Sequence, residues 1–249
     1  MIQSRQMPGT GTSPSDRLKV DAMVVTPHPD DAEFGAAGTV ALWTRQGREV
    51  VYVVCTNGDK GSSDPDMTSE RLAHIRQREQ REAATVLGVR EVVFLGHPDG
   101  GLEDTPAFRG ELVRLIREYR PDTVMTTDPY RRYLWHRDHR ITGIVTLDAV
   151  FPYARDHLSY PEHKADGLGP HSVEEVLLWG SEEPDAFIDV SETFDLKMAA
   201  LRCHSSQVDR YWDAVEQRVR ERAEKMGEDN GMPLAEAFRR VAMPQWQTR

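Results

Sequence analysis

Short apolar runs alternate with longer amphipathic segments along the first half of the chain. The runs are rich in valine and are bounded by Gly, Pro, Asp and Asn, as buried strands are. We predict strands at residues 22–26, 49–55, 91–95 and 122–126. Alternation of such strands with helices is typical of a parallel sheet covered on both faces. The pattern therefore predicts an α/β fold, Rossmann-like, with a mostly parallel sheet.

The segments between these runs carry helix signals. Residues 38–46 read as a helix closed by Gly47. Ser69 and Glu70 open a long helix that ends at Gly88, a residue common just after helices. Its apolar positions recur at helical spacing: Leu72, Ile75, Ala83, Val86 and Leu87. A further helix has its apolar face between 112 and 119 and is broken by Pro121.

The second half is less regular. We predict strands at 173–179 and 186–190 and a helix at 191–203 capped by Ser191. A charged helix follows at 211–225, and another helix is predicted at 234–241. There is no internal repeat and no interdomain linker. We therefore expect a flexible leader at 1–17 and one domain at 18–249 with a C-terminal α/β extension.

Polar clusters follow all four strands of the first half. They occupy residues 27–33, 57–66, 97–101 and 128–139. In open α/β sheets, ligands bind beyond the carboxyl ends of the strands. These clusters are thus expected along one edge of the sheet, where a site would form.

Composition and charge exclude several classes of protein. The chain has 249 residues, of which 39% are hydrophobic and 29% charged, as in globular proteins. No apolar run is long enough to span a membrane, and a net charge of −10 argues against nucleic acid as the main partner. Cys55 and Cys203 form no paired motif, and Cys55 reads as a buried, inert thiol. We expect a cytoplasmic protein.

The cluster directly after the first strand, His-Pro-Asp-Asp, has the chemistry of a metal site. Imidazole and carboxylate groups are good zinc ligands. Asp30 and Asp31 are adjacent, so one can bind the ion while the other faces its water. The competing interpretation of residues 27–31 is an ordinary polar turn in which an aspartate caps the next helix.

The second cluster, His-Arg-Asp-His, lies at a predicted helix start. His136 and His139 are three residues apart and so share a helix face. Together with His28 and Asp31 they give three ligands and one spare histidine, the arrangement of catalytic rather than structural zinc. A solvated helix start is the alternative.

At these residues the sequence resembles the LmbE-like, or PIG-L, family of N-acetylglucosamine deacetylases. PHPDDAEFGAAGT at 27–39 is similar to the family's opening Ala-His-Pro-Asp-Asp and the helix start after it, with Pro27 and Ala37 as departures. HRDH resembles the family's His-x-Asp-His. Further matches extend the resemblance from about 21 to 207: TNGDKGSSDP, LAHIRQREQREAATVLG, LGHPDGGL and LWGSEEPDAFIDVSETFDLKMAALRCHSSQ.

The resemblance implies a Rossmann-like domain with one zinc ion per chain. It places metal ligation on His28, Asp31 and His139, and the general base on Asp30. His₂-Asp ligation also suits iron or another divalent ion. A metal ion would activate water for attack on an amide carbonyl.

The resemblance also assigns supporting roles. His136 would polarise the carbonyl or protonate the leaving amine, and Asp138 would orient His136. Arg76 and Glu79 in the long helix match family positions, and the family's arginine contacts substrate. Asp99 could contact a sugar hydroxyl or simply form a turn before a glycine. Arg76 could instead belong to a solvated face of its arginine-rich helix.

The implied substrate is a small-molecule amino sugar, with no nucleic acid or membrane partner. Acylated thiol-sugar conjugates remain an alternative, and relatives suggest a homo-oligomer, a trimer or hexamer. A silent sugar- or nucleotide-binding module is the rival class, since Gly35 and Gly38 would sit at a strand-to-helix turn. A two-metal phosphoesterase would need more carboxylates.

The remaining histidines and the tryptophans receive no catalytic role. His204 matches a family segment, but its chemistry assigns no role. His97 reads as a loop residue. The other histidines are expected at the surface: His74, His157, His163 and His171. The tryptophans are expected in the core or at an interface: Trp43, Trp135, Trp179, Trp212 and Trp246. Trp135 is a possible exception, because it adjoins His136.

Overall fold

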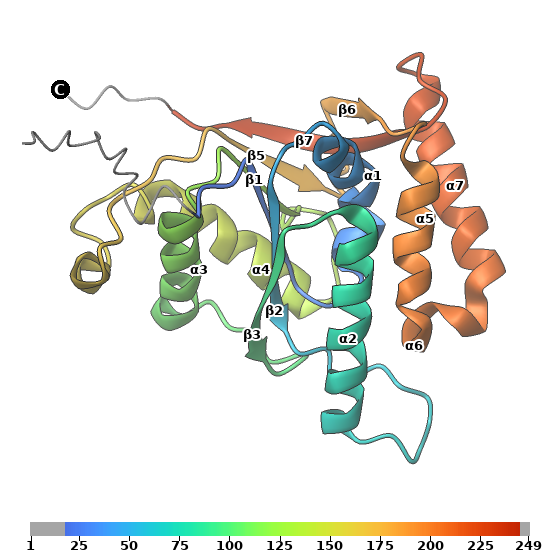
Figure 1. Cartoon of the computed structure of the whole chain (residues 1–249), viewed down its shortest axis with the longest axis horizontal. Helices are drawn as coiled ribbons and strands as arrows, with labels where there is room; N and C mark the ends of the chain where they lie inside the picture. Colours follow the sequence, from blue (N-terminus) through green and yellow to red (C-terminus); the bar gives the residue numbers. More distant parts are fainter. Residues whose placement is uncertain (1–17, 245–249) are drawn as a thin grey trace, which may run out of the picture.

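Seven strands form one sheet in the order β3-β2-β1-β4-β5-β7-β6 in the computed structural model, which describes residues 18–244 (Figure 1). The expected leader, residues 1–17, lies outside the described residues. The strands are β1 Ala22–Thr26, β2 Val50–Thr56, β3 Glu91–His97, β4 Thr123–Thr127, β5 Glu175–Trp179, β6 Ala186–Asp189 and β7 Ala235–Ala242. The main helices are α1 Asp31–Arg45, α2 Ser69–Leu87, α3 Pro106–Tyr119, α4 Arg137–Asp148, α5 Phe194–Cys203, α6 Ser205–Val208 and α7 Trp212–Glu228.

The first five strands of this order run parallel. In the middle of the sheet, Val24 of β1 lies between Tyr52 of β2 and Met125 of β4. Only β7 runs in the opposite direction, because it pairs antiparallel with both β5 and β6, so β6 has the same direction as the first five strands. The α/β fold with a mostly parallel sheet is thus confirmed.

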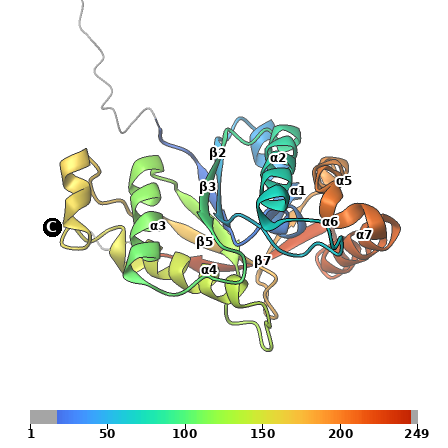
Figure 2. The same cartoon turned by 90° about the horizontal axis from the view of Figure 1, so that it is seen from below.

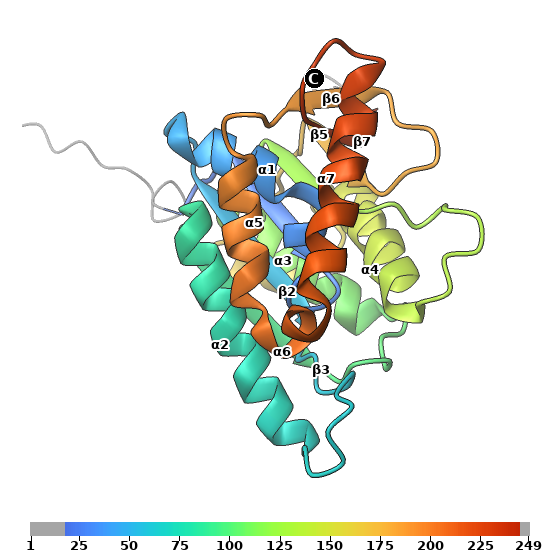
Figure 3. The same cartoon turned by 90° about the vertical axis from the view of Figure 1, so that its right-hand side faces the viewer.

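Helices cover both faces of the sheet, which explains why the central strands are apolar throughout. Helices α1, α2 and α5 lie on one face and α3 and α4 on the other (Figure 2). β1, β2 and β4 are buried along their whole length, as expected for parallel strands between two helical layers. On the outside, α7 lies beside α5 (Figure 3), and Ala223 packs near Phe194 and Met198.

Most elements fall where the pattern predicts them, with shifted ends. Thr68 caps α2, one residue before the predicted opening, and Gly88 ends it in the left-handed conformation. Helix α3 begins at Pro106, with Thr105 as its cap. Cys55 is fully buried in β2, as expected, and burial raises the pKa of its thiol.

Three predictions about elements are wrong. Residues 234–241 form a strand, not a helix, because β7 completes the sheet between β5 and β6. Ser191 does not cap α5, which begins at Phe194 after Thr193. Helix α1 begins seven residues earlier than predicted, at Asp31 rather than residue 38.

The two glycines expected at a strand-to-helix turn lie inside α1 instead. A Cβ on Gly35 would lie 2.5 Å from the ring of Trp179 in β5. Gly35 and Gly38 therefore lie inside α1 for close packing, not at the strand-to-helix turn where a phosphate would bind. Among residues 18–244, no helix has both the length and the apolar character needed to cross a bilayer.

Candidate metal centre

The site lies where the sheet changes its winding direction. Strands β1 and β4 are parallel neighbours, but α1 follows β1 onto one face and α4 follows β4 onto the other. In open α/β sheets a crevice forms at the carboxyl ends of two such strands. The two sequence clusters occupy this point: residues 27–31 follow β1, and 136–139 form the start of α4 with the residue before it.

The turn after β1 holds Asp30 in an unusual backbone conformation. Its φ is 103°, a region that residues other than glycine rarely adopt and that costs about 1–3 kcal/mol. Asp30 occupies the cap position of α1, yet its side chain makes no capping hydrogen bond. Its carboxylate lies instead 3.2 Å from the guanidinium of Arg76. The interpretation of this cluster as an ordinary helix cap is therefore wrong.

His28 is buried among three carboxylates. Its Nδ1 lies 2.9 Å from Asp31 Oδ2, and its Nε2 lies 3.1 Å from both Asp99 Oδ1 and Asp138 Oδ2. Burial alone would lower the pKa of His28, but the bonds to Asp138, Asp31 and Asp99 raise it to about 12. The site is therefore strongly electronegative and favours a cation.

Asp31 joins the two sequence clusters. The oxygen that contacts His28 also lies 3.2 Å from Nε2 of His139. Burial opposes the charge on Asp31, yet His139 and His28 hold its pKa well below the ordinary value. The three predicted metal ligands thus share one contact point.

His136 completes a group of three imidazoles. It is the residue before α4, and its ring centroid lies 4.6 Å from that of His28 and 5.0 Å from that of His139. Burial and the charges of these two histidines lower the pKa of His136. The rings of His136 and His139 thus lie together, although His136 stands just before α4 and not on a face of the helix.

This donor set fits a divalent metal. Donor atoms of His28, His136 and His139 all lie within 4.8 Å of one another, as do those of His28, Asp99, His136 and Asp138. Imidazole nitrogen and carboxylate oxygen are ligands of zinc and iron. Because these two sets differ from each other and from the predicted His28, Asp31 and His139, the ligand assignment stays a prediction.

Asp138 is fixed by the loop after β3. Its side chain is fully buried and accepts hydrogen bonds from the backbone of Gly100, at 2.6 Å, and of Leu102, at 3.2 Å. Its contact partner at the site is His28, not His136. The resemblance implied that Asp138 orients His136. In the structure its contact is with His28.

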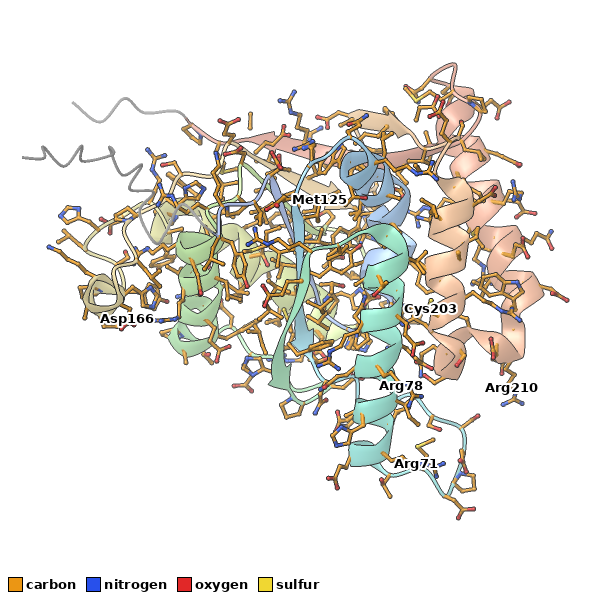
Figure 4. All side chains as sticks on the ribbon, in the orientation of Figure 1. Arg71, Arg78, Met125, Asp166, Cys203 and Arg210 are labelled. Atoms are coloured by element: carbon orange, nitrogen blue, oxygen red, sulfur yellow. The ribbon has the colours of Figure 1, made fainter. Side chains whose placement is uncertain are left out.

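Arg76 is part of the site wall and not of a solvated face. Its guanidinium donates to the carbonyl oxygens of Pro29, at 2.6 Å, and Gly58, at 3.2 Å. Its neighbours Arg71 and Arg78 on α2 extend outward (Figure 4), whereas Arg76 is only 5% exposed. The interpretation of Arg76 as a surface charge is wrong, and its substrate contact stays a prediction.

The two remaining substrate-binding candidates differ in position. Asp99 contacts His28 and lies 3.8 Å from Arg76, so it belongs to the site. Glu79 is buried, and its carboxylate accepts bonds from the hydroxyls of Ser205 and Ser206 and from the latter's amide. The structure therefore gives Glu79 a role in holding α6, and its substrate contact stays a prediction.

Sequence reasoning missed a buried polar chain behind Asp30. The backbone amide of Asp30 donates to Gln80 Oε1 at 3.1 Å, and Gln80 Nε2 donates to Glu33 at 2.8 Å. Glu33 in turn lies 3.2 Å from His204, which is completely buried. These residues lie in segments that resemble the family, but the sequence does not show that they meet, because they come from three different helical segments.

Expectations for the other histidines and tryptophans are partly wrong. His163 and His171 are buried, whereas His74 and His157 are exposed as expected. His97 ends β3 and lies 2.7 Å from Glu111. Trp43 and Trp179 belong to the core, Trp135 is 87% exposed, and Trp246 lies outside the described residues.

The proteins that this chain resembles are described as deacetylases. The family model described as PIG-L, GlcNAc-PI de-N-acetylase, matches residues 23–150. A diacetylchitobiose deacetylase of Thermococcus kodakarensis is 34% identical over 220 residues, which cover 88% of this chain and 82% of the relative. A probable N-acetyl-alpha-D-glucosaminyl L-malate deacetylase 2 of Bacillus cereus is 31% identical and covers 75% of this chain and 83% of the relative.

A solved structure shares the architecture. The N,N'-diacetylchitobiose deacetylase of Pyrococcus horikoshii, determined with an inhibitor, superposes with a TM-score of 0.85. It is 32% identical, and the match covers 89% of this chain and 83% of that one.

Proposed function

Because the chain belongs to the PIG-L family, described as GlcNAc-PI de-N-acetylases, we propose that it is a zinc-dependent hydrolase that removes an N-acetyl group from an N-acetylglucosamine-type conjugate. The observation that carries this proposal is the convergence of His28, Asp31 and His139 beside Asp30 at the switch point of the sheet. Similarity to deacetylases over most of the chain supports the same reaction.

The metal would be held by His28, Asp31 and His139. When bound, such an ion polarises a carbonyl and lowers the pKa of a bound water. Three protein ligands leave a position open for water and substrate. Zinc is the ion that this ligand chemistry favours, with other divalent ions as alternatives.

Asp30 would act as the general base. Its carboxylate makes no capping hydrogen bond to α1, and Asp30 is adjacent to Asp31 in the sequence. The carboxylate could therefore take a proton from the attacking water. The water oxygen then bonds to the acetyl carbon, the C–N bond breaks, and acetate and a free amine leave. Arg76 anchors the Asp30 turn by its bonds to Pro29 and Asp30.

His136 would act on the carbonyl oxygen or on the leaving amine. Its ring is accessible and adjoins His28 and His139. From there it can donate a hydrogen bond to the developing oxyanion or a proton to the leaving amine. Asp138 and Asp99 would hold the His28 ring from the other side.

Metal content measured together with acetate release tests the proposal. We expect about one zinc per chain and acetate release from N-acetylglucosamine derivatives, with both lost in His139→Ala. Metal without acetate would favour a larger amide, such as an acylated thiol-sugar conjugate. No metal after zinc is supplied would contradict the proposal and favour a silent binding module.

Two further proposals accompany the reaction. The substrate would be a small amino sugar, as the deacetylase relatives suggest, and the chain would form a homo-oligomer, a trimer or hexamer, whose mass light scattering would check. The cytoplasmic location proposed from the unpaired cysteines would be checked by fractionation.

A further inference from the structure

A second chamber opens beside the metal centre. It has a volume of about 300 Å³, which is at the small end of the range for ligand pockets. Asp31 and His139 form part of its wall, so the chamber adjoins the metal centre. Helices α1, α5 and α7 and strand β7 form most of the rest.

Three arginines line this chamber. Arg218 and Arg222 lie one turn apart on α7, and Arg131 comes from the loop after β4. In the described part of the chain, no carboxylate forms a direct ion pair with any of the three. The surrounding protein and the charge of Arg131 lower the pKa of Arg222, whereas Glu236 acts in the opposite direction.

The other charges of the chamber have partners of their own: Asp31 contacts His28 and His139 of the metal centre, and Lys197 pairs with Glu236. Lys197 Nζ lies 2.6 Å from Glu236 Oε1, and both side chains are buried. The two carboxylate oxygens of Glu236 also accept the backbone amides of Gly38 and Thr39, at 2.9 and 2.8 Å. The carboxylate of Glu236 therefore bonds to α1 and α5. It does not neutralise the positive charges of the three arginines.

This local positive charge contrasts with the net charge of −10 of the whole chain. Like charges that line one cavity repel each other, and a bound anion removes this cost. Guanidinium groups bind carboxylates and phosphates through paired hydrogen bonds. The apolar part of the wall, with Phe34 and Trp179, suits a sugar ring or a short aglycone.

We propose that this chamber binds an anionic substituent, a carboxylate or a phosphate, of the amino-sugar substrate through Arg131, Arg218 and Arg222. The inference rests on the proposed deacetylase function and deepens it by naming the substrate class. A neutral disaccharide would leave the three charges without a partner. The enzyme should therefore prefer an acidic amino-sugar conjugate.

The test compares three N-acetylglucosamine derivatives that differ in charge. They are the neutral methyl glycoside, the carboxymethyl glycoside and the 1-phosphate, and kcat/KM is measured by acetate release. We expect at least one anionic derivative to exceed the methyl glycoside about tenfold or more, and the better of the two identifies carboxylate or phosphate. Equal values for all three would overturn the inference and leave the deacetylase function intact.

Variants assign the preference to the arginines. We expect the anionic-to-neutral ratio of kcat/KM to fall about tenfold in Arg218→Met and in Arg222→Met. Lys225→Met removes one positive charge from the same helix outside the chamber and should keep the wild-type ratio. A preference that survives both arginine variants would overturn the inference.

Calorimetric binding of the same three compounds separates the two hypotheses if no acetate is released. Absence of acetate from every compound contradicts the proposed function. Tighter binding of an anionic compound, weakened in Arg222→Met, would still support an anion site in the chamber. Binding that does not depend on charge would overturn it.

Discussion

Nε2 of His204 lies 3.2 Å from Oε2 of Glu33, and both side chains are completely buried. The two atoms are in ion-pair contact without the alignment of a hydrogen bond. Burial alone would lower the pKa of His204, but Glu33 raises it. Through Gln80, Glu33 is linked to the backbone of Asp30, so this pair supports the turn that carries the candidate base.

His204→Ala should strongly destabilise the protein. It leaves the Glu33 carboxylate buried without its positive partner, and breaking a buried pair in this way costs about 3–5 kcal/mol. Urea denaturation measures the change in the free energy of unfolding. His74→Ala, at an exposed position, is the matched control. A loss below about 1 kcal/mol for His204→Ala would show that Glu33 is satisfied without the histidine.

Asp30→Asn should abolish most turnover and keep the metal. The amide has nearly the shape of the carboxylate but accepts no proton, and a general base contributes about 10²–10⁴-fold to rate. The measurements are kcat for acetate release and zinc per chain by mass spectrometry. His28→Ala serves as the contrast, because it should lose the metal as well. Unchanged kcat in Asp30→Asn would disprove the base assignment.

Arg76→Lys should lower kcat/KM although the positive charge is kept. The guanidinium bonds Pro29, Gly58 and Asp30 at once, and a single ammonium cannot reproduce that fork. A small displacement of the Asp30 turn can cost up to about 100-fold in rate. Arg78→Lys, on the exposed face of the same helix, should change nothing. Equal activity of the two variants would leave Arg76 without a role in the site.

The central strands and the two metal clusters could be predicted from the sequence because their signals are local. A strand such as β2, buried on both faces, must be apolar throughout, and the polar residues after it must lie at its end. The order of β1 and β4 then brings His28 and His139 together through the general geometry of parallel sheets.

Long-range contacts decided what the sequence could not show. Residues 234–241 have apolar positions that suit a helix, but pairing of β7 with β5 and β6 outweighs that preference. The burial of Glu236 depends on Lys197, which is 39 residues away. His204 matches a family segment, but the sequence does not show its role, because its partner Glu33 lies far away in the chain.

Arg117→Met should destabilise the segment after α4. Arg117 is nearly buried, and its guanidinium donates to carbonyl oxygens of a single loop: those of Tyr153, Ala154, Asp156, Ser159 and Tyr160. Each buried carbonyl left without a donor costs about 1–3 kcal/mol, so we expect a total loss of about 3 kcal/mol or more. Urea denaturation checks it, with Arg114→Met, at a half-exposed position on the same helix, as control. A loss below about 1 kcal/mol would mean that water replaces the guanidinium.

His163 should make the protein less stable in mild acid. Burial, followed by the charge of Arg117, lowers the pKa of His163 below its ordinary value of 6.5. Its Nδ1 lies 3.4 Å from Arg117 Nη1, which suits only a neutral ring. Glu162 and Asp166 act in the opposite direction, and Arg114 acts with Arg117. The unfolded chain thus binds this proton more readily than the folded one. The stabilising contribution is complete above about pH 6.5 and is lost as the pH falls through the folded-state pKa.

Comparison with a variant that cannot be protonated isolates this effect from every other titrating group. His163→Gln keeps a polar side chain but carries no charge at any pH. The free energy of unfolding, measured in urea at about pH 7.5 and about pH 5, should fall less in the variant than in the wild type. The exposed His157→Gln should follow the wild type, since its ring is open to water. If His163→Gln loses as much stability as the wild type over this range, the proton is taken up elsewhere and Arg117 tolerates a charged neighbour.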